Sequence, residues 1–141
     1  MENYQTIMNQ YYARELYTTI FISVLALATF IFIIIAIIKW DLPKWFLLFW
    51  LIIVPIIIFS FVELKSIKDD IRYSSYVTYE GEYLQIKKGL EIKQTTVIYI
   101  DGKEKWLVSL SSITSNGTFY GYVVYSERSG RVVYVGDNPP D

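Results

Sequence analysis

Two long stretches without a charged residue constrain this chain most. Residues Tyr17–Ile38 and Trp45–Val62 contain no Asp, Glu, Lys or Arg, and only the six residues Lys39–Lys44 separate them. A helix rises about 1.5 Å per residue, so the first stretch would extend over ~33 Å, against a bilayer hydrocarbon core of ~30 Å. We therefore predict two membrane-spanning helices, at 17–38 and 45–62, in this chain of 141 residues.

The connection between these stretches predicts a tight antiparallel hairpin. Trp40 and Trp45 flank it, and tryptophan is enriched at the level of the lipid headgroups. Pro43 disfavours helix at Leu42 but suits the first turn of the next helix. A hairpin places both termini on one side of the membrane.

Basic residues near the membrane favour the cytoplasm for that side. Four lie on the side of the termini and two in the connection: Arg14, Lys65, Lys68 and Arg72 against Lys39 and Lys44. Positively charged flanks are retained in the cytoplasm. The excess is small, and it favours cytoplasmic termini only weakly.

Small residues in the first span form a candidate helix-association stripe. Thr19, Ser23 and Ala26 recur at i, i+4 and i+7, so another helix could approach closely along this face. Two interpretations stay open, namely packing of the two helices of one chain and self-association into a homo-oligomer. Ionisable side chains are absent from both spans, which disfavours a transporter or a pump.

The remaining chain predicts a short helix and a β domain. We expect a polar N-terminal segment at 1–16, a juxtamembrane helix and linker at 63–75, a β domain at 76–136 and a frayed tail at 137–141. Alternation of β-branched and aromatic residues predicts about six strands, namely Tyr76–Tyr79, Glu82–Lys88, Thr95–Ile100, Lys103–Leu110, Thr118–Ser126 and Arg131–Val135.

Tight turns join these predicted strands. Asp101-Gly102 between two strand-like runs is a strong hairpin signal, because both turn positions favour φ > 0. Asn116-Gly117 and Ser129-Gly130 are further turn signals. The predicted fold class is therefore membrane α plus all-β, in which a two-helix hairpin precedes a small antiparallel meander that forms a barrel or a sandwich.

Composition excludes several kinds of site. The chain has no cysteine and no histidine, which removes disulfides, thiolate or imidazole metal sites and Ser-His-Asp or Cys-His catalysis. Residues 63–141 carry 10 basic and 11 acidic side chains, which disfavours binding to nucleic acid. Glu80, Glu82 and Glu104 lack a nucleophile beside them, and Asp69-Asp70 lacks the spacing of a cation loop. We expect no catalytic residue, no metal and no cofactor.

Aromatic and basic residues late in the chain are the candidates for ligand binding. An aromatic face could stack a base, a sugar or a peptide, and arginines could bind an anion. The candidates are Tyr120, Tyr122, Tyr125, Arg128 and Arg131. The alternative interpretation is that the tyrosines simply pack in the sheet and the arginines are solvated in turns.

Two stretches of the tail resemble a pattern found in small uncharacterised bacterial membrane proteins with a two-helix anchor and a short β tail. These are Tyr76–Tyr83 (YVTYEGEY) and Gly121–Val133 (GYVVYSERSGRVV). The order of parts also resembles the two-helix β-barrel effectors of bacterial anti-phage signalling (CBASS), in which a barrel recognises a cyclic nucleotide. This resemblance implies a bacterial cell membrane, but it transfers no residue roles.

The expected function is that of a non-enzymatic, membrane-anchored β-domain binding module. It would sit in the lipid bilayer and recognise a protein partner, in an immunity or accessory role. The alternative is a ligand-gated two-helix membrane effector whose β domain senses a small molecule such as a nucleotide. An enzyme that uses carboxylates or hydroxyls is the third hypothesis.

Overall fold

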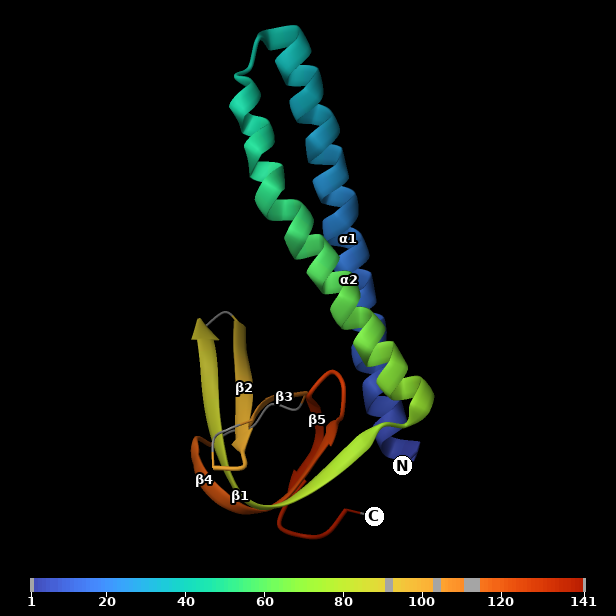
Figure 1. Ribbon diagram of the computed structural model, residues 1–141, viewed down its shortest axis with the longest axis vertical. Coiled ribbons are helices and arrows are strands. Elements are labelled where there is room, and N and C mark those ends of the chain that lie inside the picture. The colour runs from blue at the N-terminus through green and yellow to red at the C-terminus, as the bar shows by residue number, and fades with distance from the viewer. Residues whose placement is uncertain (1, 91–92, 103–104, 111–114, 141) are drawn as a thin grey trace. The chain divides into compact units, whose positions relative to one another are not determined.

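The computed structural model describes residues 2–90, 93–102, 105–110 and 115–140. Its elements, in chain order (Figure 1), are α1 (Glu2–Trp40), the 3₁₀ helix η1 (Lys44–Phe49), α2 (Trp50–Tyr73), β1 (Tyr76–Leu90), β2 (Lys93–Ile100), β3 (Lys105–Ser109), β4 (Gly117–Ser126) and β5 (Arg131–Gly136). The chain divides into two compact units. One is Tyr12–Lys65, and the other combines Met1–Tyr11 with Ser66–Asp141.

The first unit is a helical hairpin. Two helical segments, Asn3–Trp40 and Lys44–Tyr73, are long and apolar enough to cross a membrane, as judged from length and composition. Most of their large apolar side chains are exposed, among them Phe21, Leu27, Ile31, Leu51, Ile52 and Phe59. The prediction of two apolar helices of spanning length is confirmed. The second predicted span begins within η1 rather than in an α-helix.

The chain reverses direction at 41–43, between α1 and η1. Asp41 has φ 54°, which turns the backbone out of the helix, and Pro43 precedes the first residue of η1. The amide of Leu42 donates a hydrogen bond of 3.5 Å to the carbonyl oxygen of Ala36. Figure 1 shows α1 and α2 running antiparallel from this turn, as in the predicted hairpin.

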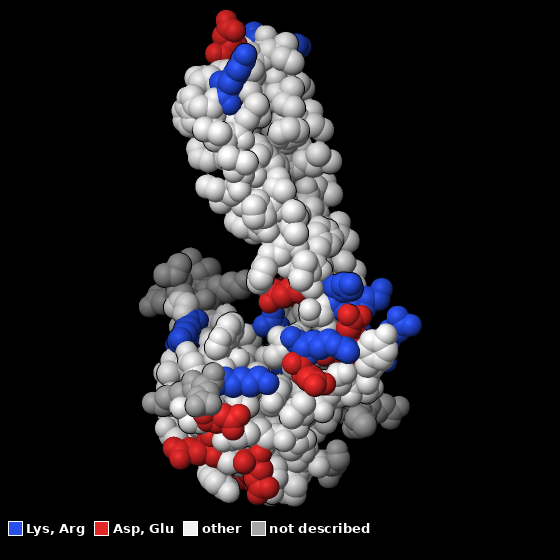
Figure 2. Space-filling view, viewed as in Figure 1, with Lys and Arg blue, Asp and Glu red and all other residues white. Residues whose placement is uncertain are grey.

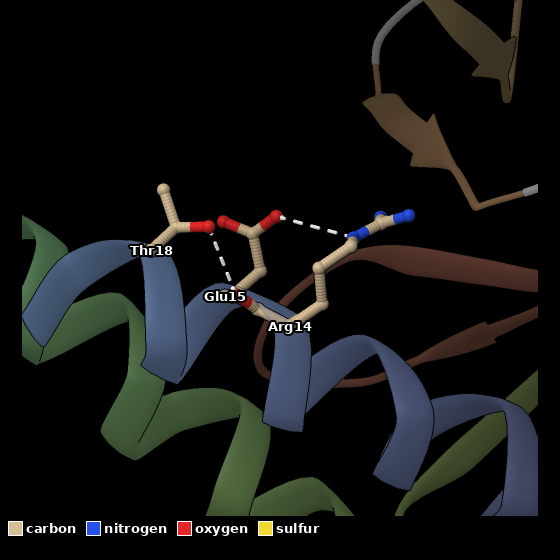
Figure 3. Close-up of polar contacts among 3 residues, drawn as sticks. All are labelled: Arg14, Glu15 and Thr18. Atoms are coloured by element: carbon tan, nitrogen blue, oxygen red, sulfur yellow. Dashed lines mark hydrogen bonds and ion pairs between the residues drawn. The ribbon is translucent and has the colours of Figure 1, made fainter. Parts of the chain in front are cut away.

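Hydroxyl groups within the helices are satisfied by their own backbone. The hydroxyl of Ser23 donates to the carbonyl oxygen of Thr19 at 2.7 Å, and Thr29 and Ser60 make the same type of bond four residues back. Thr18 does so to Arg14 at 3.0 Å, beside the Arg14–Glu15 ion pair of 4.0 Å (Figure 3). Such bonds allow polar side chains in an apolar helix without unpaired hydroxyls.

The β domain is a mixed five-stranded sheet whose pairings return to their starting strand. The order is β1-β2-β3-β5-β4, and β1 pairs with both β2 and β4. β3 and β5 are parallel, with Val108 opposite Arg131, and the other pairs are antiparallel. The expected meander of six antiparallel strands is therefore wrong in two respects, strand number and the direction of one pair.

One long strand replaces the first two predicted strands. The alternation of strand residues breaks at Gly81, so the sequence predicted two strands separated there. In the structure Gly81 has φ +150°, and β1 continues through it opposite Gly121 of β4. A Cβ atom on Gly121 would lie 2.5 Å from the carbonyl oxygen of Gly136. The two glycines thus permit a bent strand and a close approach of β4 to β5.

Substitution of Gly121 by alanine is expected to destabilise the β domain by about 1–3 kcal/mol, because the added Cβ would collide with backbone rather than with a movable side chain. Gly102→Ala is the matched control. It meets nothing within 4 Å and suffers only from its φ of +62°, which costs about 1 kcal/mol. Denaturant unfolding of the full chain in detergent would measure both. Equal stabilities of Gly121→Ala and wild type would contradict the close approach.

Residues in two of the predicted turns have the positive φ angles that their residue types favour. Asp101 and Gly102 have φ 51° and φ 62° and lie in the connection between the antiparallel strands β2 and β3, whose last paired residues are Ile100 and Lys105. Gly130 has φ 63° in the turn between β4 and β5. A register shift in the β4–β5 pair lies between Val124 and Tyr125. The hairpin prediction at Asp101-Gly102 is confirmed.

The core of the β domain draws on all five strands. Its buried members are Tyr83, Ile98, Ile100, Leu107, Val123, Tyr125 and Val132. Val77, Tyr79 and Val135 pack against it. This core holds the strands that carry the site described next.

Candidate binding site on the β domain

A small pocket on the β domain has three tyrosines among its seven lining residues. Its volume is about 190 Å³, and its lining residues are Tyr79, Glu82, Tyr83, Leu84, Tyr99, Gly102 and Thr118. They come from β1, β2, β4 and the β2–β3 turn. We call this the tyrosine pocket.

Strand register explains why these residues meet. Tyr99 of β2 lies opposite Leu84 of β1, and Leu84 lies opposite Thr118 of β4. Paired residues project from the same face of a sheet, as do residues two apart along one strand. Glu82 therefore shares this face with Leu84, and it lies opposite Tyr120.

The bend of β1 brings a further tyrosine to the pocket. The hydroxyl of Tyr79 donates a hydrogen bond of 3.0 Å to the carbonyl oxygen of Glu82, across the bend at Gly81. A Cβ on Gly81 would lie 2.8 Å from that hydroxyl. The absent side chain of Gly81 thus leaves room for the phenol of Tyr79 beside Glu82.

Carboxylates dominate the electrostatics around the pocket. Burial raises the pKa of Tyr83, and the charge of Asp137 and the nearby Tyr134 raise it further. The Glu80 carboxylate raises the pKa of Tyr122, whose hydroxyl donates to it at 3.4 Å. Figure 2 shows acidic side chains gathered at one end of the β domain, the lower end in this view.

A pH titration would test the environment of Tyr83. In the unfolded chain a tyrosine ionises near pH 10, whereas the raised pKa of Tyr83 keeps it neutral in the fold. Its contribution to stability is therefore complete below pH 10 and is lost as the pH rises through the raised pKa. Tyr83→Phe is expected to flatten the fall of the melting temperature towards about pH 11. The same change at exposed Tyr120 is the control, and an equal effect there would contradict this assignment.

One cation already lies against the pocket. The ammonium group of Lys88 is 5.2 Å from the centroid of the Tyr99 ring and donates a hydrogen bond to its hydroxyl. Because the hydroxyl lies between the ammonium group and the ring, Lys88 sits close to the plane of the ring and not over its face. The contact is therefore a hydrogen bond to the phenol oxygen.

Two large aromatic side chains stand exposed beside the pocket. Trp106 of β3 is 65% exposed and Tyr120 of β4 is 71% exposed. Trp106 lies opposite Tyr99, and Tyr120 lies opposite Glu82, so both share the outer face of the sheet with Glu82, Leu84 and Tyr99. Tyr79 and Tyr83 alternate with Glu82 and Leu84 along β1 and belong to the core side of the sheet.

The predicted ligand residues do not form one site. Tyr120 and Tyr122 lie on β4 opposite Glu82 and Glu80, next to the tyrosine pocket but not in its lining. Tyr125 is a buried core residue, and the ammonium group of Lys105 donates to its hydroxyl at 3.2 Å.

The two predicted arginines lie in and after the β4–β5 turn. The Arg128 guanidinium is 5.1 Å from the centroid of Tyr73, and that of Arg72 is 5.4 Å from the same ring. Arg131 is buried, with its guanidinium 5.6 Å from the Tyr11 ring. These arginines pack against aromatic rings rather than lining the pocket.

A buried carboxylate binds this same turn to the end of α2. Asp70 is fully buried, and its two carboxylate oxygens accept hydrogen bonds from the amides of Arg128 at 3.1 Å and Ser129 at 2.7 Å. The amide of Glu127 also donates to the carbonyl oxygen of Ser75. Asp70, which together with Asp69 lacks the spacing of a cation loop, instead fixes the β4–β5 turn through these two hydrogen bonds.

The candidate helix-association stripe lies in the hairpin unit. Thr19, Ser23 and Ala26 are all half-buried, whereas neighbouring Ile20, Ile22 and Leu25 are exposed. The stripe therefore faces partly into the hairpin. Close packing in this unit is also visible where the Phe30 and Trp50 rings meet edge to face, with centroids 4.8 Å apart.

Glu80 and Glu82 both belong to the described chain, and Glu104 lies outside the described residues. Within the described ranges, no group of three or more acidic side chains is placed to hold a metal ion. No protein-family model, curated protein or solved structure matches this chain.

Proposed function

We propose that this chain is a non-enzymatic membrane protein with two spans, whose β domain is a small barrel that binds a protein partner. The observation that carries the proposal is the set of outer aromatics, defined as Tyr99, Trp106 and Tyr120. Trp106 and Tyr120 are exposed and Tyr99 is half-buried, and all three project from the outer surface of the sheet, which supports an aromatic contact surface of the kind enriched at interface centres.

The size of the pocket supports a protein partner over a nucleotide. Pockets for drug-sized ligands occupy about 300–1,000 Å³. The tyrosine pocket, at about 190 Å³, is smaller and suits a single side chain. The flanking Trp106 and Tyr120 would then cover the surface around that side chain.

Photocrosslinking in cells would test this function. A photoreactive phenylalanine analogue in place of Trp106 is expected to give a discrete adduct with one protein. The same analogue in place of Thr78, an exposed residue of β1, is the control and should give none. Identical adduct patterns at both positions, or no adduct at Trp106, would refute a partner on this face.

The side of the membrane is tested with a single cysteine. Pro139 is exposed near the end of the β domain, and the chain has no cysteine of its own, so Pro139→Cys supplies its one thiol. The excess of basic residues near the termini favours the cytoplasm. An impermeant maleimide should therefore label Pro139→Cys only after the cells are permeabilised. Labelling of intact cells would place the β domain outside.

A second candidate function is a ligand-gated membrane effector. The hydrogen bonds from the β4–β5 turn to Asp70 favour it, because they join the β domain to the helix that continues from the second span. A small molecule that moved this turn would act directly on α2. Ligand-dependent oligomers and toxicity on overproduction would distinguish it from the binding module.

A further inference from the structure

The lining of the tyrosine pocket has the chemistry of a cation site. Tyr79 and Tyr99 supply aromatic rings, the buried ring of Tyr83 forms part of the wall, and Glu82 supplies a carboxylate. Aromatic rings with a neighbouring negative charge are the usual recognition elements for ammonium groups. An anion would instead meet Glu82 directly, which disfavours phosphate or carboxylate ligands.

Acidic side chains around the tyrosine pocket add negative charge to that of Glu82. Glu80 lies two residues from Glu82 on the same face of β1, Asp101 adjoins the lining residue Gly102, and the charge of Asp137 acts on Tyr83. Lys88 donates a hydrogen bond to the Tyr99 hydroxyl at the rim of the pocket, so its positive charge would oppose an incoming cation.

We infer that the tyrosine pocket binds an ammonium group, supplied by a lysine side chain of the protein partner. This inference rests on the proposed function for the source of the lysine. The pocket volume of about 190 Å³ suits one such group, and Trp106 and Tyr120 lie beside it to contact the partner around the lysine. A free small amine such as choline has the same chemistry and is the other source.

Binding of a lysine analogue to the purified full chain in detergent would test the inference. The probe is N-acetyl-lysine N-methylamide, followed through the NMR signals of the tyrosine rings at constant ionic strength. The ring signals of the pocket tyrosines are expected to shift, whereas the corresponding glutamate derivative should leave them unchanged. Equal shifts with both probes, or none with the lysine probe, would overturn the inference.

Two substitutions with opposite expected effects sharpen the test. Glu82→Gln removes the lining carboxylate and should weaken lysine binding about fivefold, whereas Lys88→Gln removes the competing cation and should strengthen it about twofold. Glu127→Gln removes the same charge from the β4–β5 turn and is the matched control. Circular dichroism would show that each variant is folded. Equal affinities of Glu82→Gln and Glu127→Gln would overturn the role of the pocket.

The remaining outcomes separate the source of the cation from the proposed function. Tighter binding of choline than of the lysine probe would overturn a partner lysine in favour of a free amine. Crosslinks at Trp106 without lysine binding would overturn this inference alone. Lysine binding without crosslinks would overturn the protein partner and leave the ammonium site.

Discussion

Replacement of Asp70 by alanine is expected to destabilise the β domain by about 3 kcal/mol or more. The carboxylate is fully buried and accepts the amides of Arg128 and Ser129. Hydrogen bonds to a charged acceptor contribute about 1.5–3 kcal/mol each, and alanine would leave two amides without their partner. Hydrogen exchange of the full chain in detergent should show the largest loss of protection in β4 and β5.

Two variants isolate the hydrogen bonds from the charge. Asp69→Ala removes the same charge from the adjacent, half-buried position, and we expect it to change stability by no more than about 0.5 kcal/mol. Asp70→Asn keeps one acceptor oxygen, and its destabilisation should be about half of that caused by alanine. If Asp70→Ala were no less stable than Asp69→Ala, the hydrogen bonds from the β4–β5 turn to Asp70 would contribute nothing to stability.

Local chemistry made the helices and the tight turns predictable. The absence of charge in 17–38 and 45–62 predicted the two apolar helices, and Asp101-Gly102 predicted its hairpin from backbone preference alone. The predicted juxtamembrane helix within 63–75 is likewise present as the end of α2. Each of these signals acts within a few residues.

Long-range pairing was not predictable in the same way. Gly81 looks like an interruption, because its effect depends on Gly121, which lies opposite it although forty residues away in sequence. The parallel pairing of β3 with β5 likewise has no local signal. Alternation of residue types predicts that a strand forms, but it does not determine which strand pairs with it or in which direction.

The candidate site shows the same limit. Tyrosine content predicted an aromatic surface, and Tyr120 and Tyr122 do lie beside the pocket. The lining itself combines Tyr99, which the β1–β2 register places opposite Leu84, with Tyr79, which the bend at Gly81 brings beside Glu82. The sequence Tyr79-Glu80-Gly81-Glu82-Tyr83, in which aromatic and acidic residues surround a glycine, is the signal that could have indicated it.

Two arginines in the middle of α1 are expected to reduce its insertion into a membrane to about half or less. Residues 17–38 include 14 Ile, Leu, Phe and Val residues. Each contributes about −0.3 to −0.6 kcal/mol to insertion at most, so their sum is about −4 to −8 kcal/mol. One central arginine opposes this with about +2.5 to +3.5 kcal/mol, which leaves insertion favourable. Two should bring the balance close to zero.

Leu27→Arg with Ile31→Arg is the variant of choice, because both side chains are exposed in the hairpin and neither supports its packing. Ile38→Arg with Trp40→Arg adds the same charge at the end of α1, where long side chains reach the interface. Because α2 would still anchor either variant, the readout is the side of the membrane on which single cysteines at Asn3 and Pro139 are labelled by an impermeant maleimide. Both positions should lie on one side in the parent and in the end variant, and on opposite sides in about half or more of the central variant. If α1 were instead exposed to water, the central arginines would replace solvent-exposed apolar surface and leave both positions where they are in the parent. Separation of the two positions in the central variant alone would therefore establish that α1 crosses the membrane.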